Sequence, residues 1–359
     1  MRLVLRIFPV LFITLTFTLP ICAQKAKNQI IAFDAAANAT TYSASINEKG
    51  EIVGYYQDVN GVHGFLRDHH GNIAAFDVPG ATHNVPGGTV PSSINALGES
   101  TGTYFDTNGR IHGFIRASDG TLSTFELGFS TYPYNINWAG EITGNYQDIG
   151  GTHGFLRNRQ GHVTTFDVSS YGTYPASVNA RSEITGFYFL EPLTPVLSAQ
   201  AGFVRSLEGR ITTFDVLGLH TTRPTGINSR GEITGSYFDA NMTPHGFIRT
   251  PDGVVATFDA SSDGTVPLSI NTSGEITGYC YQGGKIFGFV RSAHGIFLRF
   301  AASSSANETI AVGINAEGEI AGYVGDSSGI HGFLRDPHPR LWRPDEYRDW
   351  REGRDHDPN

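Results

Sequence analysis

A repeated unit occupies most of the 359-residue chain and restricts its fold more than any other feature. The word Ile/Val-Asn-x-x-x-Glu begins at Ile46, Ile94, Ile136, Val178, Ile227, Ile270 and Ile314, with gaps of 48, 42, 42, 49, 43 and 44 residues. Each complete copy holds four short β-forming runs separated by Gly- and Asp-rich turns. Four strands in a unit of this length are typical of a propeller blade. The sequence therefore predicts an all-β, seven-bladed β-propeller of four-stranded blades.

The two ends of the repeat region predict how the ring closes. The seventh copy has only three runs and finishes with "HGFLRD", residues 331–336. Its missing fourth run is found near the N-terminus as "IIAFDA", residues 30–35. Pairing of this N-terminal strand with the C-terminal unit would complete one blade. A β-helix is the best alternative, but its coils are shorter than this unit, and an open solenoid would have capped ends.

The first residues predict export. Arg2 and Arg6 flank the start of an apolar stretch, and Ala23-Gln24 is a plausible cleavage point. We therefore assign residues 1–23 to a signal peptide, 24–336 to the propeller and 337–359 to a charged C-terminal tail. A lipid anchor at Cys22 is not favoured, because Ile21 stands where a small residue is needed.

The composition of the mature chain restricts its partners. Loss of Arg2 and Arg6 makes the formal net charge two units more negative than −9. Such an acidic product is a poor candidate for binding nucleic acid. Only Cys280 remains after cleavage, so no intrachain disulfide can form. No second long apolar run predicts a membrane span, and we expect a monomer that is secreted or periplasmic.

The third run of the unit carries a family resemblance. It reads His-Gly-Phe-Leu-Arg from His63 and recurs with small changes down the chain. The repeat region, residues 30–336, resembles the extracellular HAF-type repeat family of bacterial secreted proteins, whose namesake word is His-Ala-Phe. The resemblance implies an exported repeat protein and says little about activity.

A histidine and a carboxylate recur 14 residues apart in several units. The pairs are His63/Asp77, His112/Glu126, His153/Asp167 and His245/Asp259, and ring closure would pair His331 with Asp34. The sixth unit loses both members, with Phe287 and Ala301, which is what a directly contacting pair predicts. We interpret the pairs as structural. Five general bases or metal ligands spread around a circle would not converge on one point.

Other residues shared by the units are interpreted as blade construction. An Asn precedes the first hairpin of each unit, where its side chain can bond the turn backbone. A Glu opens each second strand and an Arg closes each third strand, as Glu51 and Arg67 do in the first unit. We expect seven internal Glu–Arg pairs, with a ligand-binding ring as the alternative.

Residues that break the repeat are the better candidates for function. The second–third turns and the crossovers between units vary, and 190–200 is an insertion with the sequence "LEPLTPVLSAQ". Variable loops on a uniform scaffold are how binding surfaces are generally built, and Tyr suits sugars and peptides. The candidate ligand-binding residues are Tyr132, Tyr134, Tyr171, Tyr174, Glu191, His220 and Arg223.

The predicted function is an exported binding or interaction module for a carbohydrate, peptide or protein ligand. One alternative is a secreted polysaccharide hydrolase or lyase with its site in the central channel. The other is a purely structural surface protein. The chain contains no recognisable enzyme motif, so no catalytic residue, metal ligand or cofactor is assigned.

Overall fold

The computed structural model describes residues 29–82, 87–191 and 199–337 of the chain. Within these ranges every regular element is a β-strand, which confirms the predicted all-β class. No helix long and apolar enough to cross a membrane occurs among the described residues. The signal peptide assigned to residues 1–23 and the tail after residue 337 lie outside them, so both assignments stay predictions.

The strands follow one another in groups of four. The first two groups are β2 (Thr40–Ile46), β3 (Ile52–Asp58), β4 (Gly61–Arg67), β5 (Ile73–Phe76) and β6 (Thr89–Ile94), β7 (Ser100–Phe105), β8 (Ile111–Arg116), β9 (Leu122–Phe125). The third and fourth are β10 (Ser130–Ile136), β11 (Ile142–Asp148), β12 (Gly151–Arg157), β13 (Val163–Phe166) and β14 (Thr173–Val178), β15 (Ile184–Phe189), β16 (Gln200–Arg205), β17 (Ile211–Phe214). The fifth and sixth are β18 (Arg223–Ile227), β19 (Ile233–Phe238), β20 (Pro244–Arg249), β21 (Val255–Phe258) and β22 (Thr265–Ile270), β23 (Ile276–Gln282), β24 (Lys285–Arg291), β25 (Phe297–Phe300).

The last group combines strands from both ends of the described chain. It consists of β26 (Glu308–Ile314), β27 (Ile320–Asp326), β28 (Gly329–Asp336) and, as its outer strand, β1 (Gln29–Phe33). β1 is antiparallel to β28, with Gln29 opposite Asp336 and Phe33 opposite Gly332. The N-terminal strand therefore supplies the fourth run that the last copy of the repeat lacks.

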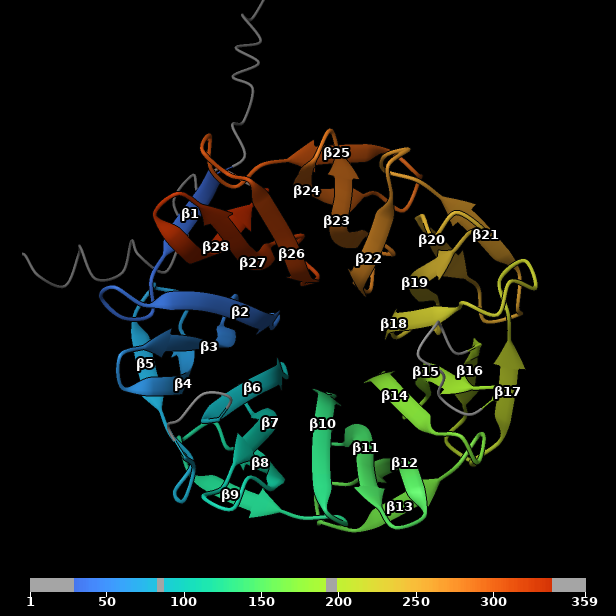
Figure 1. Ribbon diagram of the computed structural model, residues 1–359, viewed down its shortest axis with the longest axis horizontal. Coiled ribbons are helices and arrows are strands. Elements are labelled where there is room, and N and C mark those ends of the chain that lie inside the picture. The colour runs from blue at the N-terminus through green and yellow to red at the C-terminus, as the bar shows by residue number, and fades with distance from the viewer. Residues whose placement is uncertain (1–28, 83–86, 192–198, 338–359) are drawn as a thin grey trace, which may run out of the picture. The chain divides into compact units, whose positions relative to one another are not determined.

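The groups lie around a common centre, with their first strands innermost (Figure 1). Within a group, successive strands are antiparallel neighbours. Single parallel bridges join β8 to β10 and β24 to β26, so two pairs of groups form eight-stranded sheets. The fourth strand lies at the outside of its group, so each crossover carries the chain from the periphery back to the centre.

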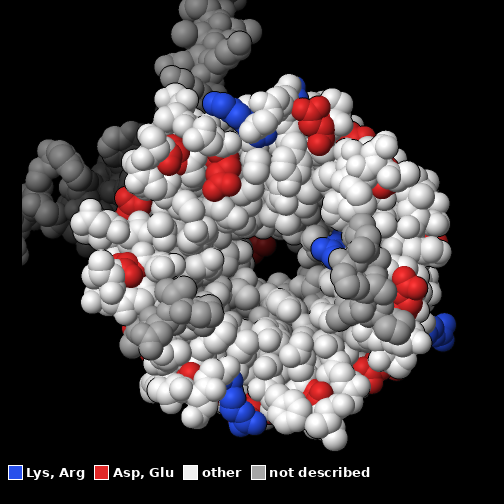
Figure 2. All heavy atoms as spheres, in the orientation of Figure 1, with Lys and Arg blue, Asp and Glu red and all other residues white. Residues whose placement is uncertain are grey.

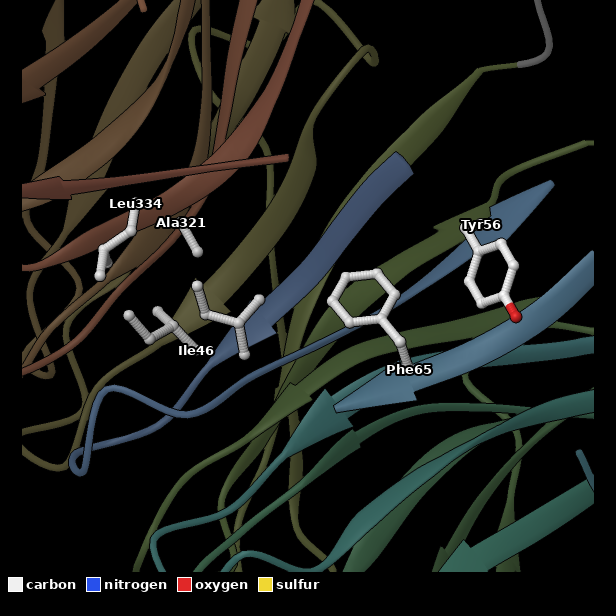
Figure 3. Close-up of a cluster of buried hydrophobic side chains, with 6 residues drawn as sticks. Ile46, Tyr56, Phe65, Ala321 and Leu334 are labelled. Atoms are coloured by element: carbon white, nitrogen blue, oxygen red, sulfur yellow. The ribbon is translucent and has the colours of Figure 1, made fainter. Parts of the chain in front are cut away.

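Phenylalanine rings fill the space between neighbouring groups. The Phe of each third strand is fully buried: Phe65, Phe114, Phe155, Phe203, Phe247, Phe289 and Phe333. The ring of Phe33 meets that of Phe65 edge-on at 6.0 Å, and most other groups repeat this contact. The cluster in Figure 3 joins Ile46 and Phe65 of the first group to Ala321 and Leu334 of the last. The core is thus shared between groups and not confined to any one of them.

Glycines in the middle strands leave room for these rings and for neighbouring backbone. Gly64 lies opposite Phe76, as the hairpin register predicts, and a Cβ at Gly64 would lie 3.0 Å from that ring. A Cβ at Gly54 would lie 2.1 Å from the carbonyl oxygen of Tyr42 and 2.9 Å from the ring of Phe65. A glycine in the middle of these strands thus allows the close approach of a ring or of neighbouring backbone.

The repeated asparagine makes four hydrogen bonds. In the first group the Oδ1 atom of Asn47 accepts from the backbone N–H groups of Lys49 and Glu51, which fixes the turn. Its Nδ2 atom donates to the Glu51 carboxylate at 2.6 Å and to the carbonyl oxygen of Asn95, in the next group, at 2.9 Å. Every group repeats the bond to the next asparagine, and the last runs from Asn315 to the carbonyl oxygen of Asn47.

The predicted Glu–Arg pairs are wrong, because both partners have other contacts. The register places Ile52, not Glu51, opposite Arg67. The guanidinium of Arg67 lies over the ring of Phe33, 5.0 Å from its centroid, and its Nη1 atom donates to the carbonyl oxygen of Asp68. The equivalent arginines of the other groups also lie over a phenylalanine ring. The glutamates are held instead by their own asparagines.

A buried threonine at or just before the start of each first strand holds the crossover from the preceding group. In the second group the hydroxyl of Thr89 accepts a hydrogen bond from the backbone N–H of Val78 at 2.9 Å. The full set comprises Thr41, Thr89, Thr131, Thr173, Thr222, Thr265 and Thr309, all 0% exposed and all bonded in this way. The crossovers can therefore vary in length between two fixed points.

We predict that Asn137→Ala destabilises the protein by about 2 kcal/mol, because it removes bonds within and between groups and leaves buried partners unsatisfied. The midpoint of urea unfolding measures the loss. Asn108→Ala is the matched control, since the Asn108 side chain only contacts Asp106 in an exposed turn. Equal losses in the two variants would contradict the role assigned to the repeated asparagine.

Candidate functional site

The first strands of all the groups line a central channel. A narrow cavity of about 300 Å³ is bordered by their C-terminal halves, where side chains such as Ala44, Ser93 and Ser177 are small. Figure 2 shows the opening at the centre of the viewed face, with charged atoms mostly toward the outer edge, a basic group beside the opening and acidic atoms deeper within it. Residues from every group converge on this channel.

A wider cavity opens where these strands begin. It has a volume of about 530 Å³ and spans strands of several groups. Its lining is mainly apolar and aromatic: Ser92, Tyr134, Tyr174, Pro175, Ala176, Phe187, Arg223, Pro224, Thr225, Leu268 and Val312. We refer to it as the mouth cavity. A concave apolar site with few polar groups is the usual form of a small-ligand site.

Three side chains from two neighbouring groups form one wall of the mouth cavity. Tyr174 on β14 lies opposite Phe187 on β15, and their rings stack at 4.9 Å with an interplanar angle of 3°. Arg223, the first residue of β18, places its guanidinium carbon 5.4 Å from the centroid of the Phe187 ring. The protein around Arg223 lowers its pKa by burial, but an arginine remains charged at neutral pH.

Tyr134 contributes a neutral hydroxyl to the same cavity. Burial, together with the nearby hydroxyls of Tyr132 and Tyr174, raises the pKa of Tyr134 to about 12. Its side chain nevertheless faces open space, since the residue is 40% exposed. Tyr134 therefore offers a ring surface and a hydrogen-bond donor, and it is a poor general base at neutral pH.

The structure brings some of the predicted ligand-binding residues together and separates others. Tyr134, Tyr174 and Arg223 line the mouth cavity, and Tyr132 lies close to Tyr134 on β10. Phe187, on a second strand, was missed, although its cross-strand position opposite Tyr174 could have indicated it.

The remaining predicted residues are outside the lining of the mouth cavity. Tyr171 is 45% exposed in a crossover. Glu191 accepts a hydrogen bond of 3.5 Å from the backbone of Ala199. His220 has a φ of 55° and its Nδ1 atom lies 2.6 Å from the carboxylate of Asp215.

The predicted histidine–carboxylate contacts are confirmed. The Nδ1 atom of His63 lies 2.9 Å from Asp77, and the equivalent distances are 2.9 Å for His153/Asp167 and for His245/Asp259, 2.6 Å for His331/Asp34 and 3.6 Å for His112/Glu126. A second carboxylate, from the turn before the third strand, was not predicted. In the third group it is Asp148, 3.0 Å from the Nε2 atom of His153. The ring of Tyr146 also lies against His153, 5.1 Å away.

In the third group the paired carboxylates also shift the protonation of the histidine. Burial would lower the pKa of His153, but the hydrogen bonds and charges of Asp167 and Asp148 outweigh it and raise the pKa above 6.5. The turn carboxylates shift the other way: hydrogen bonds from the backbone N–H of Arg110 and from His112 lower the pKa of Asp106 to about 2. Among the described residues, no three His, Cys, Asp or Glu side chains gather as a metal site would require.

Comparison with known proteins identifies the fold and no family. No family model and no curated protein matches the chain. Virginiamycin B lyase from Staphylococcus aureus superposes with a TM-score of 0.58 at 15% identity, over 86% of this chain and 99% of that one. A catalytically inactive variant of that enzyme with quinupristin gives 0.59 and 14%, over 86% and 99%. A streptogramin B lyase gives 0.58 and 14%, over 86% and 98%. These likenesses show a β-propeller-like fold; at such identities they show nothing further.

We predict that His153→Ala destabilises the protein more at pH 6 than at pH 9. Because folding raises the pKa of His153, its contribution is complete below about pH 6.5 and is lost as the pH rises through the folded-state value. The expected loss at pH 6 is about 1 kcal/mol, measured as the free energy of unfolding. His294→Ala, in an exposed turn, is the control. A loss that is the same at both pH values would rule out a charged clamp.

Proposed function

We propose that this protein is an exported, seven-bladed β-propeller of the HAF-repeat type that acts as a ligand-binding module. Its ligand would occupy the mouth cavity. The observation that carries this proposal is the convergence of unlike residues from different groups, Tyr134, Tyr174, Phe187 and Arg223, on one open cavity of about 530 Å³. Repeated residues build the scaffold, whereas Tyr134 and Arg223 have no residue of their kind at the equivalent positions of the other groups. The stacked pair Tyr174/Phe187 has a counterpart in the first group, Tyr42/Tyr55.

Closure of the ring is part of the proposal and has two supports. β1 pairs with β28 along its whole length, which ties the N-terminal strand into the last group. The chain of asparagine bonds runs from group to group and returns from Asn315 to Asn47. A closed ring needs both contacts, since an open array would leave its first and last units without a neighbour.

Export rests on the sequence. The basic residues, apolar stretch and small residue before Gln24 have the order of a signal peptide. The acidic net charge and the single remaining cysteine are compatible with a secreted or periplasmic protein whose stability comes from packing. The ligand would then be met outside the cytoplasm.

The rival function is catalysis in the same cavity, and lyases are among the solved structures of similar fold. The described lining of the mouth cavity contains Arg223 and two tyrosines as its titratable groups. A tyrosine whose pKa is near 12 and an arginine are poor proton acceptors at neutral pH. The histidine–carboxylate pairs, which have the right chemistry, do not line this cavity. Binding is therefore the better-supported function, and the structural-protein alternative gives no account of the cavity.

We predict that the mature chain, residues 24–359, binds a component of a peptide or glycan array without converting it. Tyr134→Ala should weaken that binding at least about tenfold, because it removes a ring and a donor from the cavity. Tyr171→Ala is the matched control, since Tyr171 is equally exposed but lies outside the cavity. Turnover of the ligand would show that the protein is an enzyme and not a binding module. Equal losses of affinity in the two variants would show that the ligand binds outside the mouth cavity.

A further inference from the structure

The charged group of the mouth cavity, Arg223, has no ion-pair partner among the residues that the structure describes. Arg223 forms no side-chain hydrogen bond or ion pair with any described residue, although its backbone pairs with Ser236. Other surface arginines are paired: Arg159 with Glu99, Arg181 with Glu183 and Arg230 with Glu232. A cation that lies against protein without a counter-charge favours an incoming anion.

Arg223 is also held in a defined position. Its guanidinium lies over the ring of Phe187, and that ring is stacked on Tyr174. A cation–π contact of this kind uses none of the N–H groups of the guanidinium, so they can still bind a planar anion with two parallel hydrogen bonds. The ordering of the arginine before binding lowers the entropic cost of that contact.

The rest of the lining defines the other part of the ligand. Pro175, Pro224, Leu268 and Val312 present apolar surface, and no carboxylate lies among the described lining residues to repel an anion. The polar groups are few, namely the hydroxyls of Ser92, Thr225 and the two tyrosines. A sugar would leave many of its hydroxyls without partners here, whereas a ring or an aliphatic group would be well accommodated.

From this geometry we propose that the mouth cavity binds a monocarboxylate carried on an aromatic or apolar body, with Arg223 as the carboxylate anchor. A single guanidinium matches one carboxylate, while a phosphate dianion would need additional cations or a cluster of N–H groups. A free aryl carboxylic acid and the C-terminal aromatic residue of a peptide share this chemistry. The inference rests on the proposed function, because it assumes that the mouth cavity is the binding site.

The test uses ligands that differ only in charge. The mature chain is titrated calorimetrically with N-acetyl-phenylalanine, with a tripeptide ending in phenylalanine, and with the C-terminal amide of each. We expect the acids to bind at least about tenfold more tightly than the amides, with an advantage that falls as salt is raised. Tighter binding of the peptide acid would identify a peptide terminus as the source, and tighter binding of the small acid would identify a free acid.

Variants separate the anchor from the cavity. Arg223→Gln should abolish the preference for acids and Arg223→Lys should restore part of it, while Arg210→Gln, an exposed arginine outside the cavity, should change nothing. Acids and amides that bind equally well would overturn the carboxylate inference. If Tyr134→Ala still abolishes that binding, the proposed function stays intact. Absence of binding to every probe would overturn the inference too. The effect of Tyr134→Ala on array binding then decides the proposed function separately.

Discussion

The structure depends on one side chain, the asparagine after each first strand. An asparagine side chain can accept and donate two hydrogen bonds each, and Asn47 uses this full capacity: two bonds close its own turn, one holds Glu51, and one reaches Asn95. Aspartate would lack the donors, and serine would lack the reach. The bond to the next asparagine is 2.9–3.1 Å long in every group, so each group sets the position of its neighbour. The glycine of the next turn fits this scheme, because a Cβ at Gly98 would lie 3.2 Å from the Glu51 carboxylate.

The asparagine contacts make one end of the channel uniform and leave the variation to the other. In the fourth group Ser182 replaces the turn glycine, and its hydroxyl donates a hydrogen bond to Glu141 of the preceding group. The turn therefore still contacts the glutamate of the preceding group, here through a hydrogen bond. At the opposite end, the buried threonines fix the point where each crossover joins a first strand. The residues between these points are free to differ. Arg223 and Tyr174 occupy positions just after the threonines Thr222 and Thr173, at the start of the strands that line the mouth cavity.

Contacts inside a hairpin could be predicted from the sequence, and contacts between groups could not. A constant spacing of 14 residues implies a constant register, which is why the His63/Asp77 pair could be predicted. The partner of Arg67, in contrast, is Phe33, which belongs to another group and stands at no characteristic distance in the chain. The same limit applies to the site. Departure from the repeat indicated Tyr134, Tyr174 and Arg223, but also Tyr171 and His220, because sequence alone does not say which irregular residues point to the channel.

A ring of identical units would surround its axis with identical side chains. Because all directions around the axis would then be equivalent, such a ring would not hold an asymmetric ligand in one defined orientation. The wall of the mouth cavity breaks this equivalence across a boundary: Tyr174 and Phe187 belong to the fourth group, and Arg223 to the fifth. The spacing of those groups is set at the other end of the same strands by the bond from Asn179 to the carbonyl oxygen of Asn228, at 2.9 Å. The position of Arg223 over Phe187 therefore depends on a hydrogen bond between asparagines that lies away from the mouth cavity. In this protein the repeated residues determine where the unlike ones meet, and the cavity has its shape because the groups follow one another regularly.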